Sequence, residues 1–130
     1  MTGALPWLQV LAVAAGAAVG ALLRWASALA FNHPGGEGIQ LGTLLVNCVG
    51  GLMIGFAMLW FQRYPNEPMR LLLVTGFLGG LTTFSAFSGE SLALLQRGDW
   101  GWALLHTLLH VVGSLACAAL GFRFARTLFA

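Results

Sequence analysis

Charged side chains are scarce in this 130-residue sequence, and lysine is absent altogether. Only 8% of the residues are charged, against about 25% in an ordinary soluble domain, whereas 58% are hydrophobic. The charges leave four long gaps, at residues 1–23, 38–62, 71–89 and 100–122. A helix needs about 20 apolar residues to cross a bilayer, so each gap is long enough for one crossing. The composition therefore excludes a soluble globular domain and predicts a membrane protein with four transmembrane helices.

Cysteine is also rare, and the two that occur, Cys48 and Cys117, lie in apolar runs without metal-ligand spacing. We therefore expect both to be small core residues. The sequence has no recognisable catalytic triad, metal-ligand cluster or phosphate-binding loop, and no basic stripe with interleaved aromatic residues. These absences argue against an enzyme and against a nucleic-acid partner.

Turn-forming residues divide the chain into the helices of an all-α, single transmembrane domain over residues 1–130. We expect helices at about residues 5–31, 40–61, 69–95 and 100–124. The connection between the first two is rich in glycine, asparagine and proline, which favour turns. Tryptophans near the helix ends fit the aromatic belt at a membrane surface. Four crossings put both chain ends on the same side of the membrane.

The arginines only weakly determine the orientation of the chain in the membrane, because orientation depends on a Lys/Arg bias near the helix ends. Four lie on one side of the predicted membrane and two on the other, namely Arg63, Arg70, Arg123 and Arg126 against Arg24 and Arg97. Because this bias is small and no lysine adds to it, the chain is expected to be able to insert both ways round.

Three of the predicted helices carry small or polar residues four positions apart, which places them on one face. These stripes are Gly16, Gly20 and Arg24; Thr43, Asn47, Gly51 and Gly55; and His106, His110 and Ser114. The simplest interpretation is close helix packing, for which small residues are typical in membranes. An amide such as Asn47 needs polar partners in mid-membrane and often marks a pathway. Arg24 either reaches the lipid headgroups or attracts anions at a pore mouth, and the histidines, which lack a third metal ligand, are either pore lining or a satisfied core pair.

The strongest signal is the stretch Gly76–Glu90 in the third predicted helix. Its glycines and β-branched threonines disfavour a continuous helix, and a break in mid-membrane is tolerated only where the freed backbone is buried or lines an aqueous site. Backbone carbonyls that lose their helical hydrogen bonds at such a break are able to bind a cation, whereas the N-terminus of the helix segment that follows favours an anion. Phe84 and Phe87 flank Ser85, and phenyl edges are electropositive. Glu90 ends the stretch, and an acid inside the membrane is a functional candidate.

Three segments resemble the Fluc fluoride-channel family, also called CrcB. They are Gly20–Arg24, Gly42–Gly51 and Gly79–Glu90, and the resemblance extends over the whole chain in length and helix order. It implies a multi-pass protein of the bacterial plasma (inner) membrane that exports fluoride passively and relieves fluoride toxicity. It also implies an antiparallel, dual-topology homodimer in the lipid bilayer, with two pores that are each lined by both chains.

The resemblance also implies roles for individual residues. A structural sodium ion at the dimer centre would be held by the backbone carbonyls of Gly79 and Thr82. Asn47 would line the pore, and Arg24 would lie at the vestibule. The fluoride pathway as a whole is expected to comprise Asn47, Phe84, Phe87, Ser85, Thr43, Glu90, Arg24, His106 and Ser114.

Two positions depart from the family pattern. Ala86 replaces a threonine that is common between the two phenylalanines, and His106 stands where some relatives have an aromatic residue such as tyrosine. A pore built from weak donors nevertheless suits fluoride, because the ion is strongly hydrated and a deep fixed positive charge would trap it. The Asn47 amide, hydroxyl groups and phenyl edges are able to replace its water in steps.

Two other functions fit parts of the pattern. A small exporter of cationic or multidrug compounds that is coupled to protons is also a four-helix, dual-topology dimer. It needs an accessible membrane acid, and it leaves Thr43, Asn47 and Ser85 unexplained. A non-transporting assembly subunit explains the glycines but gives the broken helix no purpose. The sequence therefore favours a fluoride channel over both alternatives.

Overall fold

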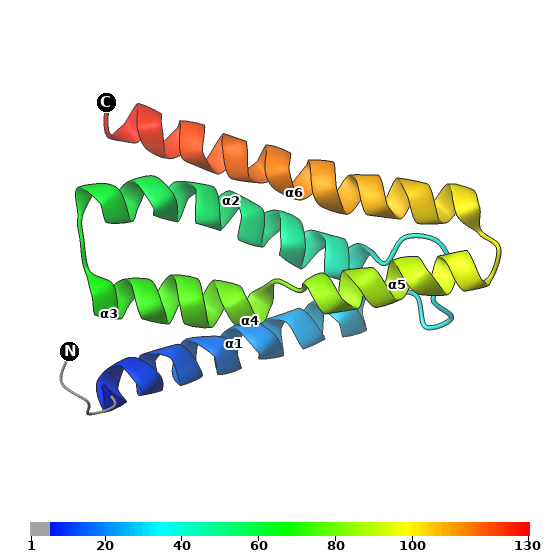
Figure 1. The fold of residues 1–130 in the computed structure, drawn as a ribbon, viewed down its shortest axis with the longest axis horizontal. Helices are drawn as coiled ribbons and strands as arrows, with labels where there is room; N and C mark the ends of the chain where they lie inside the picture. Colours follow the sequence, from blue (N-terminus) through cyan, green and yellow to red (C-terminus); the bar gives the residue numbers. More distant parts are fainter. Residues whose placement is uncertain (1–5) are drawn as a thin grey trace.

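The computed structural model describes residues 6–130, and within this range every regular element is helical (Figure 1). The elements are α1 (Trp7–Phe31), α2 (Leu41–Arg63), α3 (Glu67–Arg70), the π-type segment η1 (Leu71–Leu78), α4 (Gly79–Leu81), α5 (Phe84–Gln96) and α6 (Trp100–Leu128). The segments α3 to α5 follow one another as a single third span. Four spans are thus long and apolar enough to cross a membrane, which confirms the predicted all-α membrane fold. The expected start of the first helix at Leu5 lies outside the described residues.

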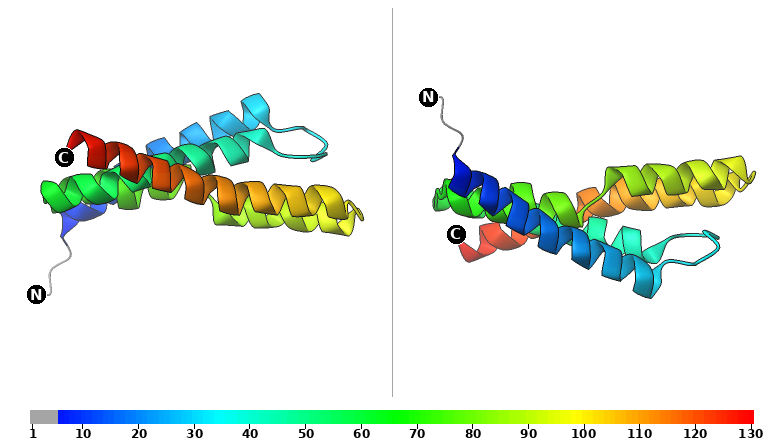
Figure 2. Two further views of the ribbon diagram at one scale, coloured as in Figure 1. Left: turned by 90° about the horizontal axis from the view of Figure 1, so that it is seen from above. Right: turned by 90° about the horizontal axis from the view of Figure 1, so that it is seen from below.

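The four spans run side by side along the long axis of the molecule, so α1 begins and α6 ends at the same end (Figure 1). Beyond the middle of the molecule the helices separate into two arms (Figure 2). One arm holds the end of α1, the loop over residues 32–40 and the start of α2, and the other holds α5 and the start of α6. This fork determines where polar side chains from distant parts of the chain meet.

The first half of the third span packs on α1 through glycines on both helices. A Cβ atom added at Gly16 would lie 2.7 Å from the Phe77 nitrogen, and one added at Gly76 would lie 2.7 Å from the Val13 oxygen. Gly20 and Gly80 make similar backbone approaches one turn further along. The predicted packing role of the first stripe is therefore confirmed, because no side chain fits between these backbones.

A second close approach joins α2 to α6. A Cβ atom added at Gly51 would lie 2.5 Å from the Ser114 oxygen, and Gly55 and Gly121 lie directly against the backbones of Ala118 and Leu52. The packing role predicted for Gly51 is confirmed in the same way. The two glycine seams thus join the spans in two pairs, α1 with η1 and α4, and α2 with α6, while α1 also contacts α2 and α5 contacts α6.

The third span is interrupted at Thr82 and Thr83, which both have extended backbone angles (φ −85°, ψ 156° and φ −149°, ψ 122°). The break predicted in mid-span is therefore confirmed. The glycines predicted to open the helix are themselves helical, since Gly79 has φ −61° and ψ −36°. Gly76 and Gly80 pack closely on α1, whereas a Cβ atom added at Gly79 would have only the Val74 oxygen of its own span within 4 Å, at 3.8 Å. The two β-branched threonines alone carry the extended stretch. After the break the Thr83 hydroxyl accepts a hydrogen bond from the Ala86 N–H at 3.0 Å and restarts the helix as an N-cap.

Candidate functional site

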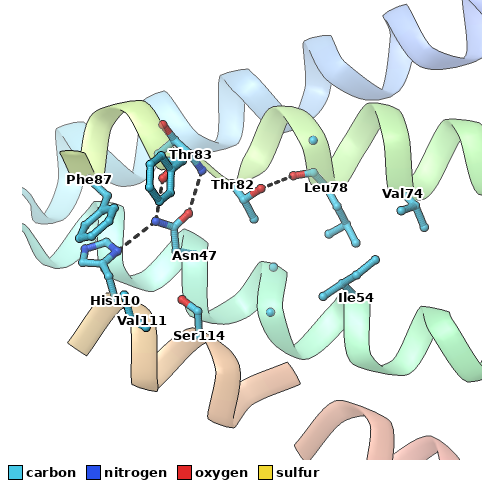
Figure 3. A pocket seen from close by; sticks show the side chains of 14 residues that line it. Asn47, Ile54, Val74, Leu78, Thr82, Thr83, Phe87, His110, Val111 and Ser114 are labelled. Atoms are coloured by element: carbon cyan, nitrogen blue, oxygen red, sulfur yellow. Dashed lines mark hydrogen bonds between the residues drawn. The ribbon is translucent and has the colours of Figure 1, made fainter. Parts of the chain in front are cut away.

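Asn47 on α2 holds both polar groups of the broken backbone (Figure 3). Its Oδ1 accepts a hydrogen bond from the Thr83 N–H at 2.8 Å, and its Nδ2 donates to the Thr83 carbonyl at 2.9 Å. A break in a membrane helix exposes groups that lipid cannot satisfy. The Asn47 side chain therefore replaces the hydrogen bonds that Thr83 would otherwise make to the preceding and the following helical turns.

A cluster of rings surrounds the far side of the same amide. The Nδ2 of Asn47 lies 3.0 Å from Nδ1 of His110 on α6. The His110 ring stacks on Phe87 with a centroid separation of 4.7 Å and an interplanar angle of 28°. His106 lies one turn away at 4.5 Å from His110 and is fully buried. We call Phe87, His106 and His110 the ring cluster.

A cavity of about 510 Å³ opens beside Asn47 and the ring cluster (Figure 3). Its lining comes from α2, the third span and α6, and includes Asn47, Gly79, Thr82, Thr83, Phe84, Phe87, His110 and Ser114. Six of the residues predicted for the pathway or the sodium site thus share one space. The lining is mainly apolar, with phenyl rings, glycines and aliphatic side chains around a few amide, hydroxyl and imidazole groups.

Phe84 and Phe87 form an edge-to-face pair but differ strongly in exposure. Their ring centroids lie 5.4 Å apart with an interplanar angle of 69°. The Phe87 side chain is 7% exposed, whereas Phe84 is 79% exposed. Phe87 therefore has its place fixed by its own chain, and Phe84 presents its ring at the surface of the molecule.

A second cavity, also about 510 Å³, lies between the two arms of the fork. Its polar lining includes Arg24 and Thr43 from one arm and Glu90 from the other, and Thr83 lines both cavities. Neither carboxyl oxygen of Glu90 has a hydrogen-bond partner among the described residues, although both are buried. Asn32 donates to the Thr43 hydroxyl at 3.1 Å. The second cavity is thus a polar space that ends at the break.

Arg24 does not extend toward the lipid headgroups. Its Nε donates a hydrogen bond to the Gly80 carbonyl at 2.9 Å, just before the break. In a continuous helix that carbonyl would receive the N–H four residues further on. The guanidinium therefore caps the end of α4 and favours it electrostatically, because a helix C-terminus carries partial negative charge.

Two further carbonyls lose their usual helical donors at the break. The Thr83 N–H, which would normally bond to the Gly79 carbonyl, donates to Asn47 instead. The Ala86 N–H, which would normally bond to Thr82, donates to the Thr83 hydroxyl. Backbone oxygens of this kind suit a hard monovalent cation. No group of three or more His, Cys, Asp or Glu able to hold a metal occurs within residues 6–130.

Two predicted pathway residues lie outside both cavities. Ser85 is exposed, and its hydroxyl lies 3.3 Å from that of Thr83. His106 is buried behind His110, and neither of its ring nitrogens has a partner within the described chain, so the interpretation as a satisfied core pair is wrong for this residue. Sequence reasoning assigned Thr83 to the helix break but not to the pathway, and it left the role of His110 open. The only available signal was the four-residue spacing of the α6 stripe.

Comparison with known proteins identifies the family. The profile described as "CrcB-like protein, Camphor Resistance (CrcB)" matches residues 11–122. A protein of Aromatoleum aromaticum named "Fluoride-specific ion channel FluC" is 54% identical over 114 residues, covering 86% of each chain. Proteins with the same name from Cupriavidus pinatubonensis and Pseudomonas aeruginosa are 53% and 50% identical, and each match covers 88% of this chain and 91% of the relative. On this evidence, the chain belongs to the CrcB family.

Proposed function

We propose that this chain is a channel through which fluoride crosses the membrane passively. The observation that carries the proposal is the identity of about half of all matched residues to relatives named as fluoride-specific ion channels, over most of both chains. The chain is a multi-pass protein of the bacterial inner membrane and not an enzyme. The names of these relatives do not favour the alternative of a cation exporter.

The proposed pathway runs through the two cavities, which share Thr83 as a lining residue. Arg24, Thr43 and Glu90 belong to the polar cavity between the arms. The other cavity offers hydroxyl and phenyl groups, which replace the water around the ion without a deep fixed charge, while both hydrogens of the Asn47 amide bond to Thr83 and His110. Such weak and repeated donors allow an ion to enter and also to leave. Ser85 and His106 would join this path only if the helices or a second subunit bring them to it.

Efflux from liposomes tests the function directly. Purified protein is reconstituted into vesicles loaded with fluoride, chloride or a quaternary ammonium salt, and release is followed with ion-selective electrodes. We expect fast release of fluoride and no release of chloride or of the organic cation. Equal release of the two halides, or release of the organic cation alone, would reject the channel.

We further propose that two antiparallel copies form the channel. The 79% exposure of Phe84 supports this arrangement, because a ring expected to line a pore needs a second surface to face it. The small arginine bias supports insertion in both orientations. In a variant with Cys48 and Cys117 replaced by alanine, Ala130→Cys should react with an impermeant reagent in about half of the molecules in intact cells. Uniform labelling or uniform protection would contradict dual topology.

Sodium is the last part of the proposal. The carbonyls of Gly79 and Thr82 fit a structural sodium ion because their usual helical donors bond elsewhere. The ion would compensate the partial negative charge at the end of α4. Because no carboxylate within residues 6–130 bonds to the broken backbone and could couple ion movements, we expect fluoride flux to be independent of a sodium gradient. Accumulation of fluoride against its own gradient under imposed sodium would indicate a symporter instead.

A further inference from the structure

We propose that His110 binds the permeating fluoride ion through its Nε2–H group, while its Nδ1 is held as an acceptor by Asn47. The inference rests on the proposed channel function and deepens it by assigning one atom of one tautomer to the ion. The relevant geometry is the contact between Asn47 and His110 beside the cavity that both residues line (Figure 3).

The hydrogen bonds around Asn47 decide which ring nitrogen carries the proton. The Thr83 N–H is only able to donate, so the amide atom that faces it at 2.8 Å is the oxygen. The other amide atom is therefore the NH₂ group, which donates to the Thr83 carbonyl at 2.9 Å and has one hydrogen left. That hydrogen points at Nδ1 of His110, 3.0 Å away. Nδ1 is thus an acceptor, and the neutral imidazole carries its proton on Nε2.

The Nε2–H of His110 has no acceptor within the described chain. The residue is 3% exposed, and Nε2 is buried without a hydrogen-bond partner. The same holds for both ring nitrogens of the adjacent His106, so three unpartnered nitrogens lie together against Phe87. A buried donor without a partner is strongly disfavoured. Its retention beside a lined cavity indicates a guest that accepts hydrogen bonds.

The neighbouring groups favour a small anion as that guest. Phe87 stacks on one face of His110, and among the residues that the structure describes His106 is the one titratable group packed directly on the ring. No carboxylate among the described residues reaches the Nε2 proton. A neutral N–H donor attracts fluoride strongly and carries no net charge that would retain it. This combination meets the requirement that an ion bind and then leave.

A purely structural role for His110 is the competing explanation. In that case the ring only holds Asn47 in place through Nδ1, and Nε2 is irrelevant. Two conservative substitutions separate the roles, because the amide of asparagine overlies the δ position of histidine and the amide of glutamine overlies the ε position. His110→Asn retains an acceptor for Asn47 and loses the ε donor. His110→Gln retains an ε donor and loses the δ acceptor.

The test measures fluoride efflux of both variants beside the unchanged protein, with size-exclusion chromatography and thermal melting as checks on folding. We expect His110→Asn to reduce flux by at least about tenfold, equivalent to about 1.4 kcal/mol, and His110→Gln to conduct at least about fivefold faster than His110→Asn. The reverse order, or equal flux in the two variants, would overturn the inference. Absence of fluoride flux in the unchanged protein would instead reject the proposed function.

A measurement on the unchanged protein removes any dependence on how well the variants fold. With ¹⁵N-labelled histidine, the NMR spectrum should give His110 a protonated Nε2 and an unprotonated Nδ1, with His110→Asn used to assign its signals. Titration with fluoride should shift the Nε2 resonance, and chloride at the same concentration should leave it unchanged. An Nε2 signal that ignores fluoride, or a proton found on Nδ1, would refute the proposal.

Discussion

The two halves of the third span differ in what they pack against and in what they leave open. Before the break, η1 and α4 lie against α1 with glycine backbones in contact. After the break, α5 packs on α6, and both Phe84 and Ser85 remain exposed. The first half thus uses its small residues for close contact within the chain. The second half keeps rings and hydroxyls available for an ion or a second subunit.

This difference explains why the break lies where it does. A straight helix would continue along α1, and its later residues would then pack on that same neighbour. The extended pair Thr82 and Thr83 lets the span change its neighbour from α1 to α6. Asn47 stabilises the change by bonding both backbone groups of Thr83. Close packing within the chain and exposed rings and hydroxyls are therefore separated within one span.

The largest effect is an expected difference in stability between two variants, each of which adds one methyl group to one half of the third span. In Gly80→Ala the new Cβ would lie 3.0 Å from the Ala17 Cα and closer still to its oxygen, both of which are backbone atoms that cannot move aside. We expect destabilisation by about 3 kcal/mol or more, with little folded protein recovered. Gly89→Ala meets nothing within 4 Å and should be neutral or stabilising by up to about 1 kcal/mol. Thermal melting in detergent makes the comparison, and equal losses would show that the halves do not differ in packing.

The next effect concerns the amide that joins α2 to the break. Asn47→Asp keeps an acceptor for the Thr83 N–H but sets a carboxylate oxygen against the Thr83 carbonyl and His110 Nδ1. We expect fluoride efflux to fall by about 100-fold, equivalent to about 2.7 kcal/mol. Asn66→Ala is the matched control, since Asn66 caps α3 at an exposed site and should cost about 1 kcal/mol of stability without loss of flux. Similar fluoride efflux in the two variants would show that the pathway does not depend on Asn47.

Substitutions of Phe84 and Phe87 test whether the second half of the third span lines the fluoride pathway. Replacing either ring with isoleucine keeps bulk but removes the electropositive rim, and we expect about tenfold lower efflux in both variants, or about 1.4 kcal/mol each. Stability should differ, because only Phe87 is buried and stacked on His110. Its replacement should cost up to about 1.5 kcal/mol, and that of Phe84 less than about 0.5 kcal/mol in the isolated chain. Folded variants with full flux would remove these rings from the pathway.

The smallest effect is expected at the contact that ties the second half to α6. The hydroxyls of Ser91 and Thr107 lie 3.1 Å apart, away from the break. Ser91→Ala should lower the free energy of unfolding by about 1 kcal/mol and leave efflux unchanged. Ser88→Ala serves as the control, because its hydroxyl bonds only to the Phe84 carbonyl of its own helix. A strong loss of flux in Ser91→Ala would mean that the position of α5 on α6 sets the pathway.

Much of this arrangement could be predicted from the sequence. Charge-free runs of membrane length located the four spans, and glycines four residues apart indicated the faces that pack, as at Gly16 and Gly51. The threonine pair within a glycine-rich run indicated the break. Each of these signals is local, because it depends on spacing along one helix.

The partners of the site residues could not be predicted in the same way. Nothing in the spacing shows that Asn47 faces Thr83, which is 36 positions away, or that its second hydrogen points at His110. Those contacts depend on how α2, α5 and α6 are arranged relative to one another. The glycines of the third span were predicted to open the helix, but they are helical, and Gly76 and Gly80 serve as contacts for the backbone of α1, which lies far away in the sequence.

Ribosomal synthesis runs from the N-terminus, so each helix enters the membrane before the helices that follow it. The glycine face of α1 is able to pack only after the third span has been inserted, because that span is its packing partner. The glycine face of α2 packs only after α6 has been inserted, for the same reason. Until α6 arrives, Asn47 is able to bond to Thr83 but not to His110. The ring cluster and both sides of the α2 seam are therefore completed last. An intermediate that lacks α6 would already have its broken helix but would lack the part of the cavity lining that α6 supplies.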